Sequence, residues 1–126
     1  MHLFSRRVSA RNTSRGTILG HRIRVAESGL SRIIGLLGER KLAPGDGLLI
    51  VPSQGVHTLG MQFPIDVLVL DNDWKILSVR KRLRPFLVTR VYLRAAAVLE
   101  LPPGTVEDSG TCVGDSVEFA RIQEPS

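Results

Sequence analysis

The sequence predicts a mainly β protein: a single small, barrel-like antiparallel domain with one short α-helix at about residues 28–38. A chain of 126 residues fits one domain with one hydrophobic core. From residue 48 onwards, short apolar runs end at Pro, Asn, Asp or Gly, which is typical of strands and turns. Only residues 28–38 show the periodicity of a good amphipathic helix.

The first part of the chain predicts an arm and two strands. Residues 1–11 are polar, basic and without periodicity, so we expect a loose N-terminal arm. Residues 17–19 and 22–26 have the character of short strands, and the second alternates charged with apolar residues. A tight hairpin at Gly20-His21 would join them.

The predicted helix has a start signal, an apolar face and a stop signal. Ser28 can cap its first turn, and Gly38 can adopt the left-handed conformation that ends a helix. Gly35, inside the helix, costs about 1 kcal/mol relative to Ala, which close packing on a sheet would explain. The apolar face has the spacing i, i+3, i+4, i+7: Leu30, Ile33, Ile34 and Leu37.

The remainder of the domain, which we place at residues 12–122, predicts further strands before a tail at 123–126. Residues 67–70 and 75–83 flank an Asp-Asn-Asp turn, so they predict an antiparallel hairpin. Other strands are expected at 48–51, 96–101 and 116–122.

Composition limits the function classes. Cys112 is the one cysteine, so no intrachain disulfide can form, which favours a reducing compartment. No stretch approaches the ~20 apolar residues of a membrane span, and no secretory signal follows Arg6 and Arg7. We therefore expect a cytoplasmic monomer. The net charge of +5 is uneven, because residues 75–94 hold seven basic residues and no acid.

Several motifs resemble one family in their order and separation: Asn12-x-Ser14-Arg15-Gly16-Thr17, Gly35-Leu36-Leu37-Gly38, Gly47-Leu48-Leu49-Ile50-x-Pro52, His57-Thr58-x-Gly60-Met61-x-Phe63-Pro64-Ile65-Asp66-Val67, Leu70-Asp71, Pro85-Phe86, Leu99-Glu100-Leu101-Pro102-x-Gly104 and Gly114-Asp115. Over about residues 12–119 the chain resembles the uncharacterised bacterial and archaeal family catalogued as domain of unknown function 192. The resemblance implies a β-barrel-like domain with one short helix and an unassigned biochemical role. Many relatives have Cys where this chain has Ser53, so thiol chemistry at that position would be lost here.

The loop from residue 52 to 66 concentrates the reactive side chains. A loop with hydroxyl, amide, imidazole and carboxylate groups over an apolar barrel is typical of a small-molecule pocket. Glu100 extends this set, because a carboxylate within an apolar strand needs a partner such as Arg32 or His57, or an exposed edge position. We therefore predict a non-catalytic binding module for an unknown small molecule or acidic partner. The pocket candidates are Ser53, Gln54, His57, Thr58, Met61, Asp66 and Glu100.

Two kinds of chemistry at this loop are alternatives. A small hydrolase-like enzyme could use His57 with Asp66 or Glu100, although Ser53 lacks the G-x-S-x-G frame of a nucleophile elbow. His57 and Met61 are possible soft metal ligands, but two ligands from one loop do not complete a site. We predict no metal, no other cofactor and no assigned catalytic residue.

A third function would use another surface. Arg80, Arg82 and Arg84 alternate with apolar residues, so a regular strand would space their guanidinium groups ~6.7 Å apart on one face. Such a line suits an acidic partner or a nucleic acid backbone. Aromatic residues make up only 5% of the chain, which disfavours base stacking. Charges on an exposed strand also prevent edge-to-edge aggregation without binding anything.

Overall fold

The computed structural model describes residues 6–27, 42–53, 63–84 and 92–122. These residues form one sheet with the strand order β5-β4-β6-β3-β2-β1-β7. Every adjacent pair is antiparallel except β2 and β3, which are parallel. The elements are β1 (Arg6–Asn12), β2 (Thr17–Ala26), β3 (Asp46–Ile50), β4 (Ile65–Leu70), β5 (Ile76–Leu83), β6 (Ala97–Leu101), α2 (Thr105–Ser109) and β7 (Val117–Arg121).

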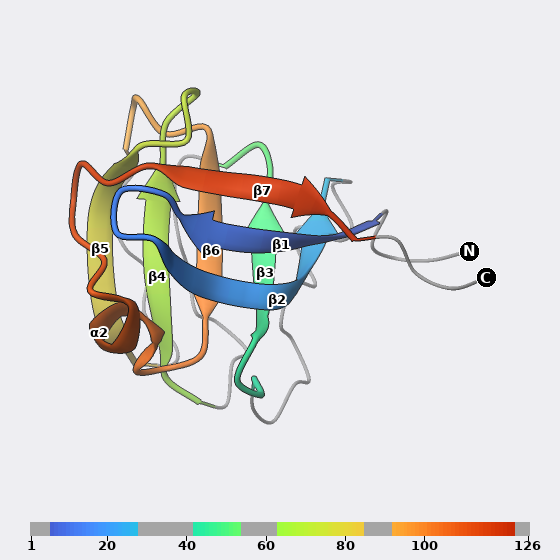
Figure 1. The fold of residues 1–126 in the computed structure, drawn as a ribbon. Coiled ribbons are helices and arrows are strands. Elements are labelled where there is room, and N and C mark those ends of the chain that lie inside the picture. Colours follow the sequence, from blue (N-terminus) through green and yellow to red (C-terminus); the bar gives the residue numbers. More distant parts are fainter. Residues whose placement is uncertain (1–5, 28–41, 54–62, 85–91, 123–126) are drawn as a thin grey trace.

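The sheet curls into a half-barrel. Figure 1 shows β7, β1 and β2 crossing in front of the more upright strands β3 to β6, with α2 at one end of the curl. A mainly β, barrel-like domain is confirmed. Within the described ranges, no helix is long and apolar enough to span a membrane.

Two apolar cores lie on the two faces of the central strands. The first core fills the curl and takes side chains from both halves of the sheet: Val8, Ala10, Leu19, Ile23, Val25, Leu49, Leu68, Leu70, Ile76, Ala97, Leu99, Leu101, Val106 and Val117. The second core lies on the opposite face of β3, β4 and β6: Ala26, Leu42, Leu48, Phe63, Ile65, Val67, Val69, Leu83, Ala95 and Val98. Because both faces are buried, these strands are apolar runs without polar alternation.

The predicted hairpin of β4 and β5 is confirmed, with Leu68 opposite Val79. Its turn is held by Asp71, whose Oδ1 accepts hydrogen bonds from the backbone N–H groups of Asp73 (2.8 Å) and Lys75 (2.9 Å). This is the local side-chain-to-backbone bonding that makes Asp frequent in turns.

The predicted hairpin at Gly20-His21 is wrong, because β2 runs unbroken through both residues. Gly20 pairs with Ala10 of β1 at a register shift. A Cβ at Gly20 would lie 2.4 Å from Ile23 Cδ1, so this glycine allows close packing within the strand. The turn that joins β1 to β2 lies at residues 13–16, where Gly16 has a φ of 71°.

The N-terminal segment differs from the predicted loose arm, because β1 begins at Arg6 and pairs with both β2 and β7. Only Val8 and Ala10 supply its apolar face, which is too short an alternation to detect in a basic segment. The predicted helix at 28–38 lies outside the described residues. Helix α2 was not predicted, since five residues cannot show helical periodicity.

Candidate functional site

Glu100 lies in the middle of the sheet. Strand β6 is hydrogen-bonded to β3 on one side and β4 on the other, with Leu48 and Val67 directly opposite Glu100. Leu48 and Val67 belong to the second core, so Glu100 faces the same apolar layer. Its exposed fraction is only 4%. The expectation that Glu100 could avoid burial at a sheet edge is therefore wrong.

Burial raises the pKa of the Glu100 carboxyl to about 8, because an apolar environment disfavours the charged form. No donor within the described part of the chain forms a hydrogen bond with this carboxyl group. Arg32 and His57, which the sequence suggested as partners, lie outside the described residues. At neutral pH the carboxyl is thus mainly protonated, and it can donate a hydrogen bond.

Asp66 is also buried, but both oxygens of its carboxylate accept hydrogen bonds. Oδ1 accepts a hydrogen bond from the Arg82 backbone N–H (2.9 Å). Oδ2 accepts from the N–H groups of Gly104 (3.1 Å) and Val106 (2.9 Å), at the start of α2. The side chain therefore joins β4, β5 and α2, and its three hydrogen bonds fix where α2 sits.

The structure places Ser53 and Asp66 near opposite ends of strand β6. The Ser53 N–H donates to the carbonyl of Ala96, just before β6 (3.0 Å), whereas Asp66 pairs with Leu101 at the other end of β6. Five residues of strand separate these positions, roughly 17 Å. Ser53 borders a hollow of about 530 Å³ whose lining is Val51, Pro52, Ser53, Asn72, Ala95 and Ala96.

The candidates Gln54, His57, Thr58 and Met61 lie outside the described residues. The chain re-enters the described structure at Phe63, whose side chain packs in the second core. Phe63 therefore lies on the sheet face that carries Glu100. A shared pocket for these residues stays a prediction.

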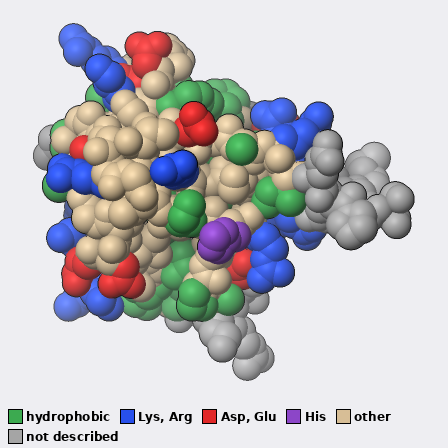
Figure 2. All heavy atoms as spheres, in the orientation of Figure 1, with side chains coloured by type: hydrophobic (Ala, Val, Ile, Leu, Met, Phe, Trp, Pro, Cys, Tyr) green, Lys and Arg blue, Asp and Glu red, His purple; other side chains and the backbone are tan. Residues whose placement is uncertain are grey.

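The arginine candidates do not follow one regular line. A register shift between β4 and β5 lies at this point, and Arg82 has a φ of 51°. The alternation of Arg80, Arg82 and Arg84 is therefore interrupted. The Arg82 side chain turns towards α2, with Nε 4.0 Å from Glu107 Oε1. On the face drawn in Figure 2, basic side chains are scattered, most of them near the rim, with no single dense patch.

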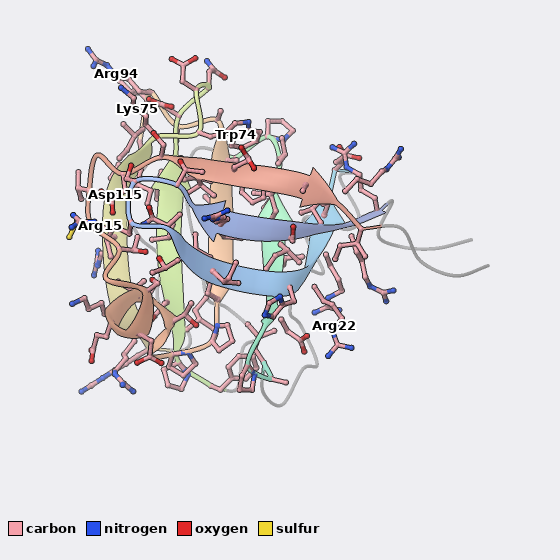
Figure 3. All side chains as sticks on the ribbon, in the orientation of Figure 1. Arg15, Arg22, Trp74, Lys75, Arg94 and Asp115 are labelled. Carbon is pink, nitrogen blue, oxygen red and sulfur yellow. The ribbon has the colours of Figure 1, made fainter. Side chains whose placement is uncertain are left out.

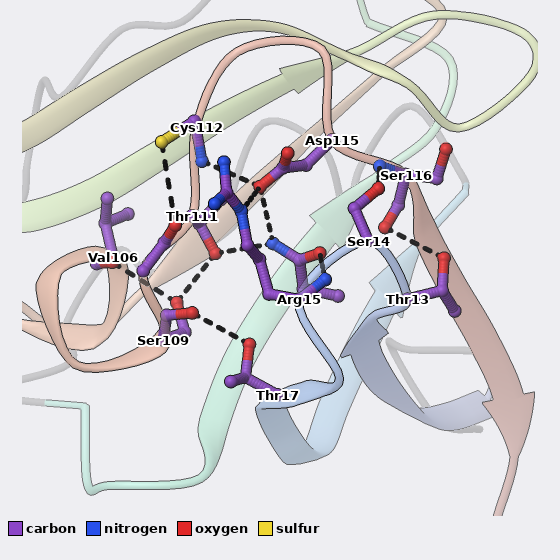
Figure 4. A network of polar contacts seen from close by, with 12 residues as sticks. Thr13, Ser14, Arg15, Thr17, Val106, Ser109, Thr111, Cys112, Asp115 and Ser116 are labelled. Carbon is purple, nitrogen blue, oxygen red and sulfur yellow. Dashed lines mark hydrogen bonds and ion pairs between the residues drawn. The ribbon is translucent and has the colours of Figure 1, made fainter.

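A polar network joins the first turn of the domain to its last. Asn12 is fully buried, and its Nδ2 donates to Thr111 Oγ1 and to Asp115 Oδ2, both at 3.0 Å. Its Oδ1 accepts from the Arg15 N–H (3.0 Å). Ser14 Oγ accepts from the Ser116 N–H (2.9 Å). Figure 4 shows these contacts converging between the β1–β2 turn and the segment that precedes β7.

Asp115 is the charged centre of this network. It accepts from Arg15 Nε (3.0 Å) and from the Cys112 N–H (2.9 Å), and Figure 3 shows Arg15 and Asp115 side by side. Burial alone would raise the pKa of Asp115, but the hydrogen bonds from Asn12, Arg15 and Cys112, with the charge of Arg15, lower it overall. The network joins parts of the fold to one another. From the sequence, Asn12, Ser14, Arg15 and Asp115 could be recognised as family motif residues, but their contacts could not be predicted. Within the described ranges, no group of three His, Cys, Asp or Glu side chains could hold a metal.

Comparison with known proteins gives a family and a fold. The chain matches the family model for domain of unknown function 192, described as an uncharacterized ACR, over residues 10–119. One similar structure is a candidate transcription regulator from Sinorhizobium meliloti 1021, with 26% identity, a TM-score of 0.76, and coverage of 94% of this chain and 97% of that chain.

A protein of unknown function from Novosphingobium aromaticivorans has a similar fold, with 19% identity and a TM-score of 0.70. That match covers 89% of this chain and 83% of the other. No curated protein matches the chain. Since the family model spans nearly the whole domain, the chain belongs to the domain of unknown function 192 family.

Proposed function

We propose that the protein is a non-catalytic binding module whose ligand contacts Glu100 on the second-core face of β3, β6 and β4. The observation that carries this proposal is a carboxyl group at 4% exposure, between Leu48 and Val67, with no donor among the described residues. Burying a carboxyl costs free energy that no hydrogen bond from the described residues offsets, so we assign this group another use. A ligand that accepts its proton in a hydrogen bond supplies that use.

The surroundings define the ligand class. A neutral carboxyl donates to a hydrogen-bond acceptor such as a carbonyl, hydroxyl or ring nitrogen. The apolar layer disfavours a free anion, because burying an unpaired charge there is costly. The flanking side chains are apolar, so the ligand presents an apolar surface around its polar group. His57 and Thr58 remain predicted contacts, and Phe63 packs on this same face.

A thermal-shift screen of uncharged metabolites tests the proposal. A true ligand raises the melting temperature of the wild-type protein and of Glu100→Gln, whose amide still donates a hydrogen bond. The rise is lost in Glu100→Leu, which fills the site with an apolar side chain. Glu118→Gln, at an exposed position on β7, is the matched control and leaves the rise intact. A ligand that stabilises Glu100→Leu as well as the wild type would contradict the proposal.

The hydrolase alternative has less support. Asp66 accepts three backbone hydrogen bonds, so it has no free role as a base, and Glu100 would be the acid available to His57. A hydrolase of this kind would lose turnover of ester substrates in both Glu100→Gln and His57→Gln. Retained turnover in either variant would remove this alternative.

A nucleic acid surface is the second candidate function. It is favoured by the exposed basic run Arg80–Arg82 on the edge strand β5 and by the similar candidate transcription regulator from Sinorhizobium meliloti. Phosphate contacts would make DNA affinity fall steeply with salt concentration. Fluorescence anisotropy with a duplex at two salt concentrations tests it, using a variant with Arg80, Lys81 and Arg82 changed to Gln. Equal affinity of variant and wild type would exclude this surface.

A further inference from the structure

A second pocket lies where β2 meets α2. Its volume is about 480 Å³, within the usual range for small-molecule sites. It is lined by Thr17, Ile18, Leu19, Gly20, His21, Pro44, Gly45, Thr105, Asp108 and Ser109. In Figure 1 these segments meet at the lower front of the half-barrel, and Figure 2 shows hydrophobic and histidine side chains together on that part of the face.

Backbone contacts hold this pocket in shape. The Gly45 carbonyl accepts hydrogen bonds from the N–H groups of His21 (2.8 Å) and Arg22 (2.9 Å), which fixes the loop before β3 against β2. Gly45 has a φ of 89°, a conformation that favours glycine. A Cβ on Gly20 would lie 3.1 Å from the Gly45 carbonyl oxygen, so the two backbones approach closely. A pocket formed in this way needs little reorganisation on binding.

Helix α2 forms the opposite wall and is fixed from two sides. Asp66 binds the N–H groups at its start, as described above. Thr17 Oγ1 donates to the carbonyl of Ser109 at its end (2.9 Å). Thr105 Oγ1 donates to the Pro102 carbonyl (2.8 Å), so the threonine hydroxyls of the lining are already used. The side chains left to meet a ligand are the Asp108 carboxylate and the His21 imidazole.

The charge of the pocket lining indicates which ligand it can bind. The lining contains no Lys or Arg, and no described side chain forms an ion pair or hydrogen bond with the Asp108 carboxylate. Ile18, Leu19 and Pro44 supply apolar surface next to it, and Ile18 is 51% exposed. We propose that this pocket binds a small organic cation, an ammonium group paired with Asp108 and carried on an apolar body that packs on Ile18 and Leu19. His21 adds a hydrogen-bonding group at the rim.

The proposal is independent of the Glu100 site, because the two share no residue. Benzylammonium and its neutral analogue benzyl alcohol are the probes, titrated into the full-length protein and followed by amide chemical shifts. Benzylammonium should shift the amides of Leu19, Gly20, Gly45 and Ser109. Asp108→Asn should weaken its binding about five-fold, the size expected of a solvent-accessible ion pair, and leave benzyl alcohol unchanged.

Two further variants complete the test. Ile18→Ser, at an exposed position, should weaken both probes because it removes apolar contact. Glu107→Gln is the control, since Glu107 is next to Asp108 in α2 but lies near Arg82 and does not line the pocket. Absence of amide shifts at millimolar benzylammonium would overturn the proposal. Shifts of equal size with benzyl alcohol, or shifts unaffected by Asp108→Asn, would overturn it too.

Discussion

Replacing Glu100 with Gln should change how the stability of the domain depends on pH. The unfolded chain exposes this carboxyl, which then ionises near its ordinary pKa of 4.5, whereas the folded protein holds the proton up to about pH 8. Between these values unfolding releases a proton, so the free energy of unfolding falls as pH rises. The contribution of Glu100 is complete below pH 4.5 and is lost by about pH 8.

The size of the effect follows from the two pKa values. Each pH unit between 4.5 and 8 removes about 1.4 kcal/mol, so the wild-type protein should lose roughly 5 kcal/mol over this window. That is a large share of the 5–15 kcal/mol typical of a domain of this size. A glutamine does not ionise, so Glu100→Gln should not show this loss.

Urea unfolding at constant ionic strength, from pH 5 to pH 9, measures the difference between the two proteins. The difference in unfolding free energy should swing by several kcal/mol in favour of Glu100→Gln as pH rises. Glu118→Gln, at an exposed position on β7, should track the wild type at every pH. If wild type and Glu100→Gln gave parallel curves, the carboxyl would not be held neutral in the apolar layer, and the basis of the proposed binding site would be lost.

Three other substitutions probe the structural contacts by urea unfolding at pH 7. Asn12→Ala should cost about 2–3 kcal/mol, because it leaves buried partners unsatisfied. Ser9→Ala, at a half-buried position of β1, should cost much less, because it removes one long hydrogen bond to the Ala120 carbonyl (3.4 Å). Asp66→Ala should cost about 3 kcal/mol by freeing three N–H groups, and it should also broaden the amide signals of α2. Gly47→Ala should cost about 1–3 kcal/mol, because its Cβ would lie 2.8 Å from the Glu100 carbonyl oxygen. Near-wild-type stability in any of the three would contradict the corresponding contact.

The strands that could be predicted are those with strong local signals. The run Val67–Leu70 is apolar and ends at an Asp-Asn-Asp turn, so both the strand and its hairpin followed from the residues alone. The predicted turn at Gly20-His21 was wrong because the glycine that indicated it has a different role in the structure. A glycine signals a turn locally, but here the absence of a side chain is required, because Ile23 of the same strand and the Gly45 carbonyl occupy the space that a Cβ would take.

The candidate site shows a similar limit. Spacing in sequence placed Ser53 and Asp66 on one loop, yet the crossing from β3 to β4 separates them by the length of β6. No sequence pattern reports that distance, because it depends on strand order. The lining of the β2–α2 pocket comes from three segments, and α2 itself is too short to give a helical signal.

The acidic residues of the family motifs differ in whether the described residues give their carboxyl groups hydrogen bonds. Asp71 holds the β4–β5 turn, Asp66 fixes the start of α2, and Asp115 joins the two ends of the domain. Each accepts hydrogen bonds that the fold itself supplies, so a structural need explains its presence. Glu100 lies in the same set of motifs, is buried as deeply, and receives no such bond from the described residues. An apolar side chain would fill its position at lower cost, and the described part of the fold therefore does not account for this residue. The proposed ligand contact would account for it, and Glu100 is therefore the position at which the function of this domain should be tested first.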